Sequence, residues 1–282
     1  MHFSTANSQT PSTWHNHEDS LMTTIRTTSA GYRNPSTVYI RRRASDPPLL
    51  MLDHNQTHIF LLVYVDDILV TGNNNEAISN MLSKLHSQFN MKNLGPAHHF
   101  LDIKIQNLTD KYFLSQSSYA LSILNSVNLT ECNPLSNTTC TKLLAQVPED
   151  AILSAPRTYR RITGSLQYLT LTRPDIAYAV NVLSQHMDEP SSQHVYLLKR
   201  LLCYLKGTQT FGLPILKALL TLSTYFDADW AGDPTTRKST TSHCTFLGDT
   251  LISWVVKKQT TVARSSMEFE YRALVAATAD NI

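Results

Sequence analysis

Two adjacent carboxylates interrupt the most hydrophobic strand-like stretch of the chain, IFLLVYVDDILVTG, which begins at Ile59. Seven apolar or aromatic residues precede Asp66 and Asp67, and a second apolar run follows from Ile68 to Val70. Two apolar strands joined through adjacent acids predict a tight hairpin that presents both carboxylates at its tip. The feature to explain is why two like charges stand between strands that belong in a core.

The residue pattern alone leaves two interpretations of this tip open. Aspartate is a common turn residue, so the pair can be a polar turn that meets water. However, turns usually contain Gly or Asn, and here Tyr64 and Ile68 crowd the acids. A divalent ion would compensate the paired charges, because Mg²⁺ prefers carboxylate oxygens and such acids hold the ions in two-metal phosphoryl transfer.

Length and composition limit the class of protein. The 282 residues, 42% hydrophobic and 16% charged, predict one large domain or two ordinary ones with a real core. The net charge of +2 gives no bulk signal for nucleic acid, so any such binding needs a local basic face. No apolar run approaches about 18 residues and no secretory leader is visible, so we expect an intracellular protein without a membrane partner. The scattered cysteines indicate reduced thiols; they are Cys132, Cys140, Cys203 and Cys244.

The first part of the chain divides into a polar leader and an ordered segment. Residues 1–57 lack periodicity and predict a solvated, partly disordered leader. A basic nucleic-acid arm is the alternative, but Arg41–Arg43 are too few to favour it. Residues 73–91 predict a helix capped by Asn74 or Asn75, and strand-like runs surround it.

The second part predicts helices first and strands afterwards. Residues 131–157 hold turn formers without a period and indicate a linker. Proline and serine signals then mark the starts of helices, and a serine cap precedes the final one. The predicted helices are 159–172, 175–187, 191–208 and 265–280, and four strand-like runs lie within 222–232, 239–249, 250–259 and 260–264.

Several motifs in a fixed order resemble reverse transcriptases of copia-type retrotransposons. They are YVDDILVTG, MKNLGPAHHFLDIKI, YRRITGSLQYLTLTRPDIAYAVNVLSQHM, LLKRLLCYLKGT, FDADWAGDPTTRKST and ISWVVKKQTTVARSSMEFEYRAL. The resemblance runs from about residue 59 to the end, roughly four-fifths of the chain, and extends to short plant reading frames derived from such elements.

The resemblance implies an α+β fold and a fragment of a Pol polyprotein. The expected parts are a leader (1–57), a partial palm with its hairpin (58–145), a helical thumb and connection (146–215), and a truncated ribonuclease H-like α/β domain (216–282). The implied cofactor is Mg²⁺ or Mn²⁺. The implied partners are an RNA template, a DNA primer and their hybrid.

The resemblance also assigns polymerase residues. Asp66 corresponds to the main metal-ligating acid, Asp67 is its neighbour, and Tyr64 lies beside the primer terminus. The family needs a further acid on an earlier strand, followed by Ala-Phe, and no such pattern occurs. Asp19, Asp46 and Asp53 match it by residue type only. Asp102 stands where the family usually has Gly, which either disturbs primer contacts or is a tolerated exposed side chain.

The ribonuclease H-like part is expected to supply two catalytic, metal-ligating acids. The resemblance assigns the strand acid to Asp227, with Asp229 as the fallback, and the helix acid to Glu270. Glu268 is the expected exposed first-turn acid, which the helix dipole favours. Asp280 imitates the family's third acid, but the unbroken helical pattern before it predicts a helix end instead.

Two groups of side chains each have a structural and a functional interpretation. Lys199, Arg200 and Lys206 are candidate phosphate contacts, and a solvated helix face is the alternative. His98 and His99 lack partners at metal-ligand spacing, so a metal site is not expected there.

Three hypotheses about activity remain open. The first is a decayed fragment, inactive alone, of an RNA-directed DNA polymerase with partial ribonuclease H. The second is a polymerase subunit that another chain completes. The third is a non-catalytic nucleic-acid-binding remnant.

Overall fold

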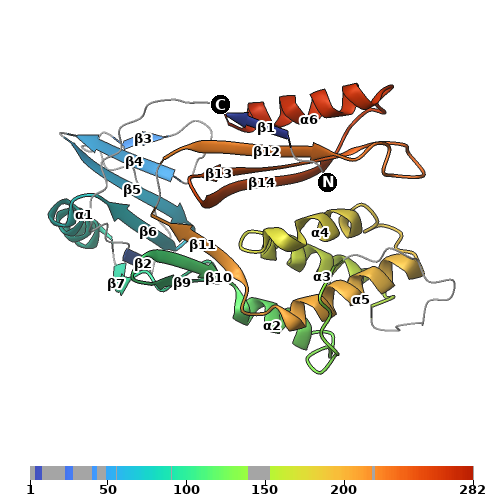
Figure 1. Cartoon of the computed structure of the whole chain (residues 1–282). Coiled ribbons are helices and arrows are strands. Elements are labelled where there is room, and N and C mark those ends of the chain that lie inside the picture. The colour runs from blue at the N-terminus through green and yellow to red at the C-terminus, as the bar shows by residue number, and fades with distance from the viewer. Residues whose placement is uncertain are drawn as a thin grey trace. The chain divides into compact units, whose positions relative to one another are not determined.

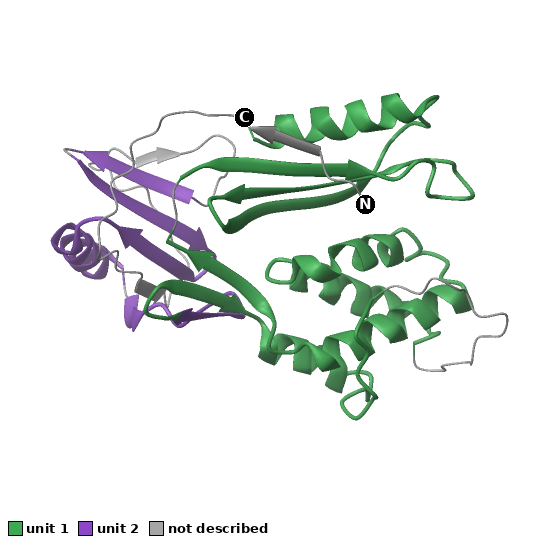
Figure 2. Cartoon of the chain, viewed as in Figure 1, with its two compact units in different colours: residues 1–12, 107–282 green, residues 13–106 purple. Residues whose placement is uncertain are grey.

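The structure is a computed structural model in which the chain forms two compact units (Figure 2). One unit holds residues 13–106, and the other holds residues 1–12 and 107–282. The described residues are 4–7, 23–27, 40–42, 49–54, 56–89, 91–138, 153–217 and 220–281. Helices and strands are mixed in an α+β fold, as predicted. No helix in these ranges is long and apolar enough to cross a membrane.

The unit of residues 13–106 contains an antiparallel sheet of six strands in the order β3-β4-β5-β6-β2-β7 (Figure 1). Alternating side chains of the two central strands enter a core that Ile59, Leu61, Ile68 and Val70 dominate. The strands are β2 (Thr23–Thr27), β3 (Ile40–Arg42), β4 (Leu49–His54), β5 (Thr57–Tyr64), β6 (Asp67–Gly72) and β7 (Met91–Pro96).

The predicted leader forms strands wherever it is described: β2, β3 and β4 belong to this sheet, and residues 4–7 pair with a strand of the other unit. Strand β4 pairs with β5 along its whole length, from Leu49 opposite Leu62 to His54 opposite Thr57. The expectation of a solvated leader is therefore wrong for residues 49–54. The short apolar run LLML is sufficient for a strand once β5 offers a partner edge. Most of residues 1–48 lie outside the described residues, so that part of the expectation stays a prediction.

Helix α1 (Asn75–Gln88) covers this sheet as its periodicity predicts. The side chain of Asn74 caps it by accepting a 3.0 Å hydrogen bond from the Ala77 amide. Ile78 is fully buried. The other predicted apolar positions are partly buried against the same core; they are Met81, Leu82, Leu85 and Phe89.

Asp102 occupies the tip of a hairpin between β8 (His99–Phe100) and β9 (Ile103–Asn107). Leu101 and Asp102 form the two-residue loop, with φ values of 49° and 59°. Positive φ at both positions is the pattern of a type I′ turn, which favours Gly and tolerates Asp. Asp102 is exposed, so a tolerated turn residue explains this position better than a disturbed close approach.

The second unit contains a helical cluster with one continuous core. Its largest buried side chains include Tyr159, Ile162, Leu166 and Leu198. Pro174 begins a short 3-10 turn before α4, and Ser191 caps α5 in a capping box with His194, as the sequence signals predict. The elements are α2 (Ser117–Asn125), α3 (Pro156–Leu169), η1 (Pro174–Ile176), α4 (Ala177–Ser184) and α5 (Ser192–Gly207).

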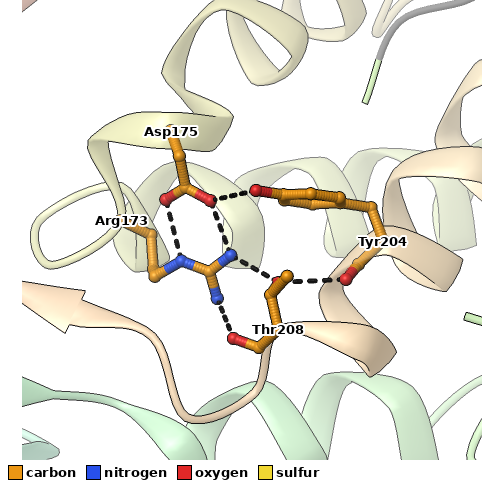
Figure 3. Close-up of polar contacts among 4 residues, drawn as sticks. All are labelled: Arg173, Asp175, Tyr204 and Thr208. Atoms are coloured by element: carbon orange, nitrogen blue, oxygen red, sulfur yellow. Dashed lines mark hydrogen bonds and ion pairs between the residues drawn. The ribbon is translucent and has the colours of Figure 1, made fainter. Parts of the chain in front are cut away.

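A buried arginine joins three parts of this cluster (Figure 3). Arg173 is only 2% exposed and makes a bidentate pair with Asp175, at 2.8 Å from Nε and 2.7 Å from Nη2. The guanidinium also donates to the Thr208 carbonyl at 2.8 Å and the Thr208 hydroxyl at 2.7 Å, and Tyr204 Oη donates to Asp175 at 2.8 Å. Phe211 lies with its ring centroid 5.4 Å from the guanidinium carbon. These bonds fix the α3–α4 connection to the end of α5.

The same unit contains an antiparallel sheet in the order β1-β12-β13-β14, with α6 (Ser266–Asp280) on one face (Figure 1). Phe226 and Ala228 pack against Phe269 and Ala273 of that helix. The backbone of β1 pairs along the edge of β12. The strands are β1 (Ser4–Asn7), β12 (Leu222–Ala228), β13 (Thr240–Leu247) and β14 (Thr250–Lys258), and a separate pair joins β10 (Lys111–Ser115) to β11 (Gly212–Leu216).

The predicted strand at 260–264 is wrong. These residues form bends and irregular backbone between β14 and α6. Ala263 is buried in the core beneath the helix, so the segment packs as a connection and forms no ladder. The alternation of small and apolar residues there was too short to separate a strand from a buried loop.

Two side-chain bonds hold strand β14 to the helical cluster. The indole nitrogen of Trp254 donates to the Thr170 carbonyl at 3.1 Å. The Asn181 amide donates to the Val256 carbonyl at 2.9 Å. The sheet of this unit thus has α6 on one face and contacts with α4 from β14.

We expect the Arg173→Ala variant to lose about 3–5 kcal/mol of unfolding free energy, because it leaves the half-buried Asp175 carboxylate without its cation. The exposed Arg161 on α3 is the matched control, and Arg161→Ala should change stability by less than about 0.5 kcal/mol. Urea denaturation of both variants measures the difference. A double-mutant cycle with Asp175→Ala should show strong coupling; additive losses would contradict this account.

Candidate functional site

The β5–β6 hairpin presents the first pair of candidate acids. Tyr64 pairs with Asp67, so Val65 and Asp66 form a two-residue loop. Asp66 is exposed, Asp67 is half-buried, and Tyr64 is 54% exposed beside them. The structure therefore brings together the three residues that the sequence predicted at this tip.

Val65 is strained at the centre of this turn. Its φ is 50°, and its side chain is 77% exposed. A β-branched residue rarely adopts positive φ, since its side chain crowds the backbone. Such strain persists where the surrounding structure fixes the conformation, and here two paired strands fix both ends of the turn. The paired strands thus keep Asp66 in the two-residue loop, where it is exposed.

The upstream acid that the family resemblance requires does not lie beside this tip among the described residues. Asp53 pairs with His58 across β4 and β5, with 3.2 Å between Oδ1 and Nδ1. His58 and Tyr64 are six positions apart on β5, and Asp53 lies opposite His58, so Asp53 is about 20 Å from the tip. Asp19 and Asp46 lie outside the described residues. In the described part of the chain, no group of three His, Cys, Asp or Glu side chains could hold a metal ion.

Asp227 and Glu270 form the second pair of candidate acids. Asp227 stands on β12 opposite Ser242 of β13, and Glu270 stands in the second turn of α6. Both are half-buried. Burial raises the pKa of Glu270, and the negative charge of Asp227 raises it further. The strand and helix assigned from the resemblance thus place two carboxylates within electrostatic reach of each other.

Asp229, the fallback strand acid, makes structural contacts with the loop next to it. Its carboxylate accepts a 2.5 Å hydrogen bond from the Thr240 amide, and its own amide donates to the Thr240 carbonyl at 3.1 Å. Gly232 packs so closely that a Cβ there would lie 2.0 Å from Asp229 Oδ2. These contacts close the loop between β12 and β13, so the geometry favours Asp227 as the strand acid.

Glu268 is bound into the start of α6. Its carboxylate accepts from the Arg264 amide at 2.6 Å and from Arg272 at 2.5 Å. The amide of Arg264 lowers the pKa of Glu268, and the charge of Arg272 lowers it further. Glu268 lies in the first turn, as predicted, but it is half-buried where the sequence predicted exposure.

Asp280 ends α6, as the helical pattern predicts. Its Oδ2 lies 3.1 Å from His243 Nε2 and accepts a 3.0 Å hydrogen bond from Ser253. Ten helical residues separate it from Glu270, a distance of about 15 Å along the axis. The His243 contact lowers the pKa of Asp280. Asp280 therefore anchors the helix end to the sheet.

The basic residues of α5 divide into two kinds. Lys199 is exposed and Lys206 is half-buried, and their spacing of seven residues puts them on the same face, two turns apart. Arg200 is half-buried and donates to Asn137 Oδ1 at 2.6 Å. Arg200 thus has a structural contact, which the sequence pattern could not reveal.

Sequence reasoning missed two residues of note. Arg173 and Asp175 flank the turn that Pro174 begins and pair across it, and the helix-start signal of Pro174 does not indicate this pair. Tyr178 of α4 lies near Asp229. Burial raises the pKa of the Tyr178 phenol, and the charge of Asp229 raises it further. No local signal could have paired residues from a helix and a distant strand.

Comparisons with known proteins found one matching family model and several relatives. The family model described as reverse transcriptase (RNA-dependent DNA polymerase) matches residues 43–141. An uncharacterized mitochondrial protein of Arabidopsis thaliana is 49% identical over 79% of this chain and 92% of its own length. A putative transposon Ty5-1 protein of Saccharomyces cerevisiae is 31% identical over 76% of this chain and 70% of its own.

A much longer relative also matches. The retrovirus-related Pol polyprotein from transposon RE1 of Arabidopsis thaliana is 42% identical over 82% of this chain. The chain spans 16% of the length of that polyprotein. No solved structure matches the chain.

We expect Glu270→Gln to stabilise the chain at neutral pH. A carboxyl whose pKa is raised on folding destabilises the fold once it ionises. The gain should therefore be absent below the ordinary glutamate pKa of 4.5 and should grow as pH rises through the raised value. Urea denaturation at about pH 4 and about pH 7 measures it.

Glu268→Gln is the matched control, with the opposite sign. A lowered pKa contributes stability that is present above 4.5 and lost on acidification, so this variant should be less stable than the parent at neutral pH. If both substitutions shift stability in the same direction, the pKa of Glu270 is not raised in the folded chain.

Proposed function

Because the chain belongs to the family of copia-type retrotransposon Pol proteins with a reverse-transcriptase domain, we propose that it supplies three functional parts of such an enzyme. Residues 58–145 are the palm segment, 146–215 the thumb and connection, and 216–282 a partial ribonuclease H-like domain. The acid-tipped hairpin, the helical cluster and the strand–helix carboxylate pair support this division.

The proposed catalytic acids are Asp66 and Asp67 for DNA synthesis and Asp227 and Glu270 for cleavage of RNA in a hybrid. Each pair offers the oxygen ligands that Mg²⁺ and Mn²⁺ prefer. A bound ion would supply positive charge to phosphate oxygens. Two carboxylates leave most ligand positions of an ion to water, so each pair fits a weakly held ion better than the two ions of a complete site.

We therefore propose that the chain alone binds nucleic acid without extending a primer. The observation that carries this proposal is the distance of Asp53 from the hairpin tip, because no other described acid is a candidate for the upstream ligand. Tyr64, exposed beside the acids, is the proposed contact for a primer end.

Nucleic-acid binding is proposed for the α5 face that carries Lys199 and Lys206. Two cations on one helix face can each neutralise a phosphate, and each neutralised phosphate adds to the salt dependence of binding. Arg200 donates a hydrogen bond to Asn137 and so holds the neighbouring loop beside this face. The RNA template, DNA primer and RNA–DNA hybrid are the proposed partners.

A primer-extension assay on an RNA template with Mg²⁺ or Mn²⁺ tests the proposal. We expect the primer–template to be retarded on a native gel by the purified chain while the primer keeps its length. Asp66→Asn should leave the retardation unchanged, since the acid is not a phosphate contact. Extension by the parent chain that Asp66→Asn abolishes would show that the site is complete, and absence of retardation would refute binding.

A further inference from the structure

Two histidine rings stack between the end of α4 and the start of α5. The ring centroids of His186 and His194 lie 3.7 Å apart, and the angle between the ring planes is 14°. His186 follows α4 and donates its amide to the Leu183 carbonyl at 3.2 Å, while His194 stands in the first turn of α5. Both residues are half-buried. The stack therefore joins the end of one helix to the start of the next.

His194 also caps the start of α5. Its Nδ1 accepts a 3.0 Å hydrogen bond from the Ser191 amide and lies 3.0 Å from the Ser191 hydroxyl oxygen. A backbone amide can only donate, so Nδ1 must carry a lone pair and the ring proton must sit on Nε2. Glu or Gln usually fills this position of a capping box, and both accept at neutral pH. A histidine accepts there only while it is uncharged.

A second proton on the His194 ring breaks this cap. Protonated imidazole carries N–H donors at both nitrogens, so Nδ1 then meets the Ser191 amide donor to donor. The positive end of the α5 dipole also disfavours a positive charge in the first turn. Burial lowers the pKa of His194, and the charge of His186 lowers it further. The fold therefore favours the neutral ring that the cap requires.

The other titratable groups near the stack do not offset this preference. From α3, Tyr159 donates to the Leu183 carbonyl at 3.0 Å, and burial raises its pKa, so this phenol stays neutral. Asp188 and Glu189 follow in the connection between α4 and α5, and both are exposed. Among the described charged side chains, only His186 shifts the pKa of His194. No described carboxylate therefore compensates a positive charge on His194.

We propose that the stacked pair of His186 and His194 is a proton-sensitive latch on the first turn of α5. At neutral pH the latch is closed and holds Ser191, with the connection from α4, against the helix. In mild acid, protonation of His194 removes the acceptor from the Ser191 amide, and the first turn opens. The opening stops there, because Leu198 and Leu201 are fully buried in the core beyond it.

Urea denaturation of the full chain at two pH values tests the latch. A lowered pKa contributes stability that is present above the ordinary histidine value of 6.5 and lost as pH falls through the lowered value. His194→Gln keeps a capping-box acceptor and removes the titration. Between about pH 7.5 and about pH 5, the urea midpoint of this variant should rise relative to the parent. A difference that stays constant with pH would overturn the proposal.

His194→Ala is the matched control, because it removes the titration and the acceptor together. At about pH 7.5 its folding equilibrium constant should be about fivefold lower than that of His194→Gln, the usual effect of losing a helix cap. Equal constants for the two variants would show that position 194 does not cap α5.

Nitrogen-15 NMR of the imidazole rings tests the latch in the parent chain itself. We expect His194 to be the Nε2–H tautomer at neutral pH and to titrate in step with the Ser191 amide signal. His186→Gln should move the midpoint of this titration to higher pH, since it removes the opposing charge. The Nδ1–H tautomer, a Ser191 signal that does not follow the titration, or an unchanged midpoint in His186→Gln would refute the latch.

Discussion

The buried guanidinium of Arg173 is the interaction on which the helical cluster depends. A charge at 2% exposure is tolerated only with full pairing, and Arg173 has it through Asp175 and Thr208. Burial would raise the pKa of Asp175, but the bonds from Arg173 outweigh it and hold the pKa below its ordinary value. Arg173 thus ties the turn before α4 to the end of α5. The chain then continues from that end toward β11. Strand β14 then joins this frame through Trp254 and Asn181.

The acids of the chain differ in what holds them. Asp229, Glu268 and Asp280 are each fixed by hydrogen bonds to nearby groups, and these bonds close a loop or end a helix. Asp227 and Glu270 instead lie within electrostatic reach of each other; burial raises the pKa of Glu270, and the charge of Asp227 raises it further. Within the described residues, neither takes part in an ion pair. Like charges that serve no structural contact are the arrangement expected where a cation is to bind.

The sequence predicted the features that depend on neighbours in the chain. The caps at Asn74 and Ser191 and the helix end at Asp280 follow from local hydrogen bonding and periodicity. The tip formed by Asp66 and Asp67 followed from two apolar strands. Contacts between distant segments could not be predicted, because no local pattern encodes them: Arg173 with Thr208, and the Trp254 indole with the Thr170 carbonyl. The strand predicted at residues 260–264 is wrong for the opposite reason. The local alternation is that of a strand, but the segment packs as a buried connection beneath α6.

The central claim is that the chain carries two separate pairs of acids, each able to hold an ion weakly. Titration with Mn²⁺, followed by paramagnetic broadening of amide signals, tests it most directly. The account predicts two centres of broadening, one at Asp66 and Asp67 and one at Asp227 and Glu270, with Glu270→Gln removing only the second. Broadening centred on Asp280, or removal of the second centre by Glu268→Gln but not by Glu270→Gln, would contradict it.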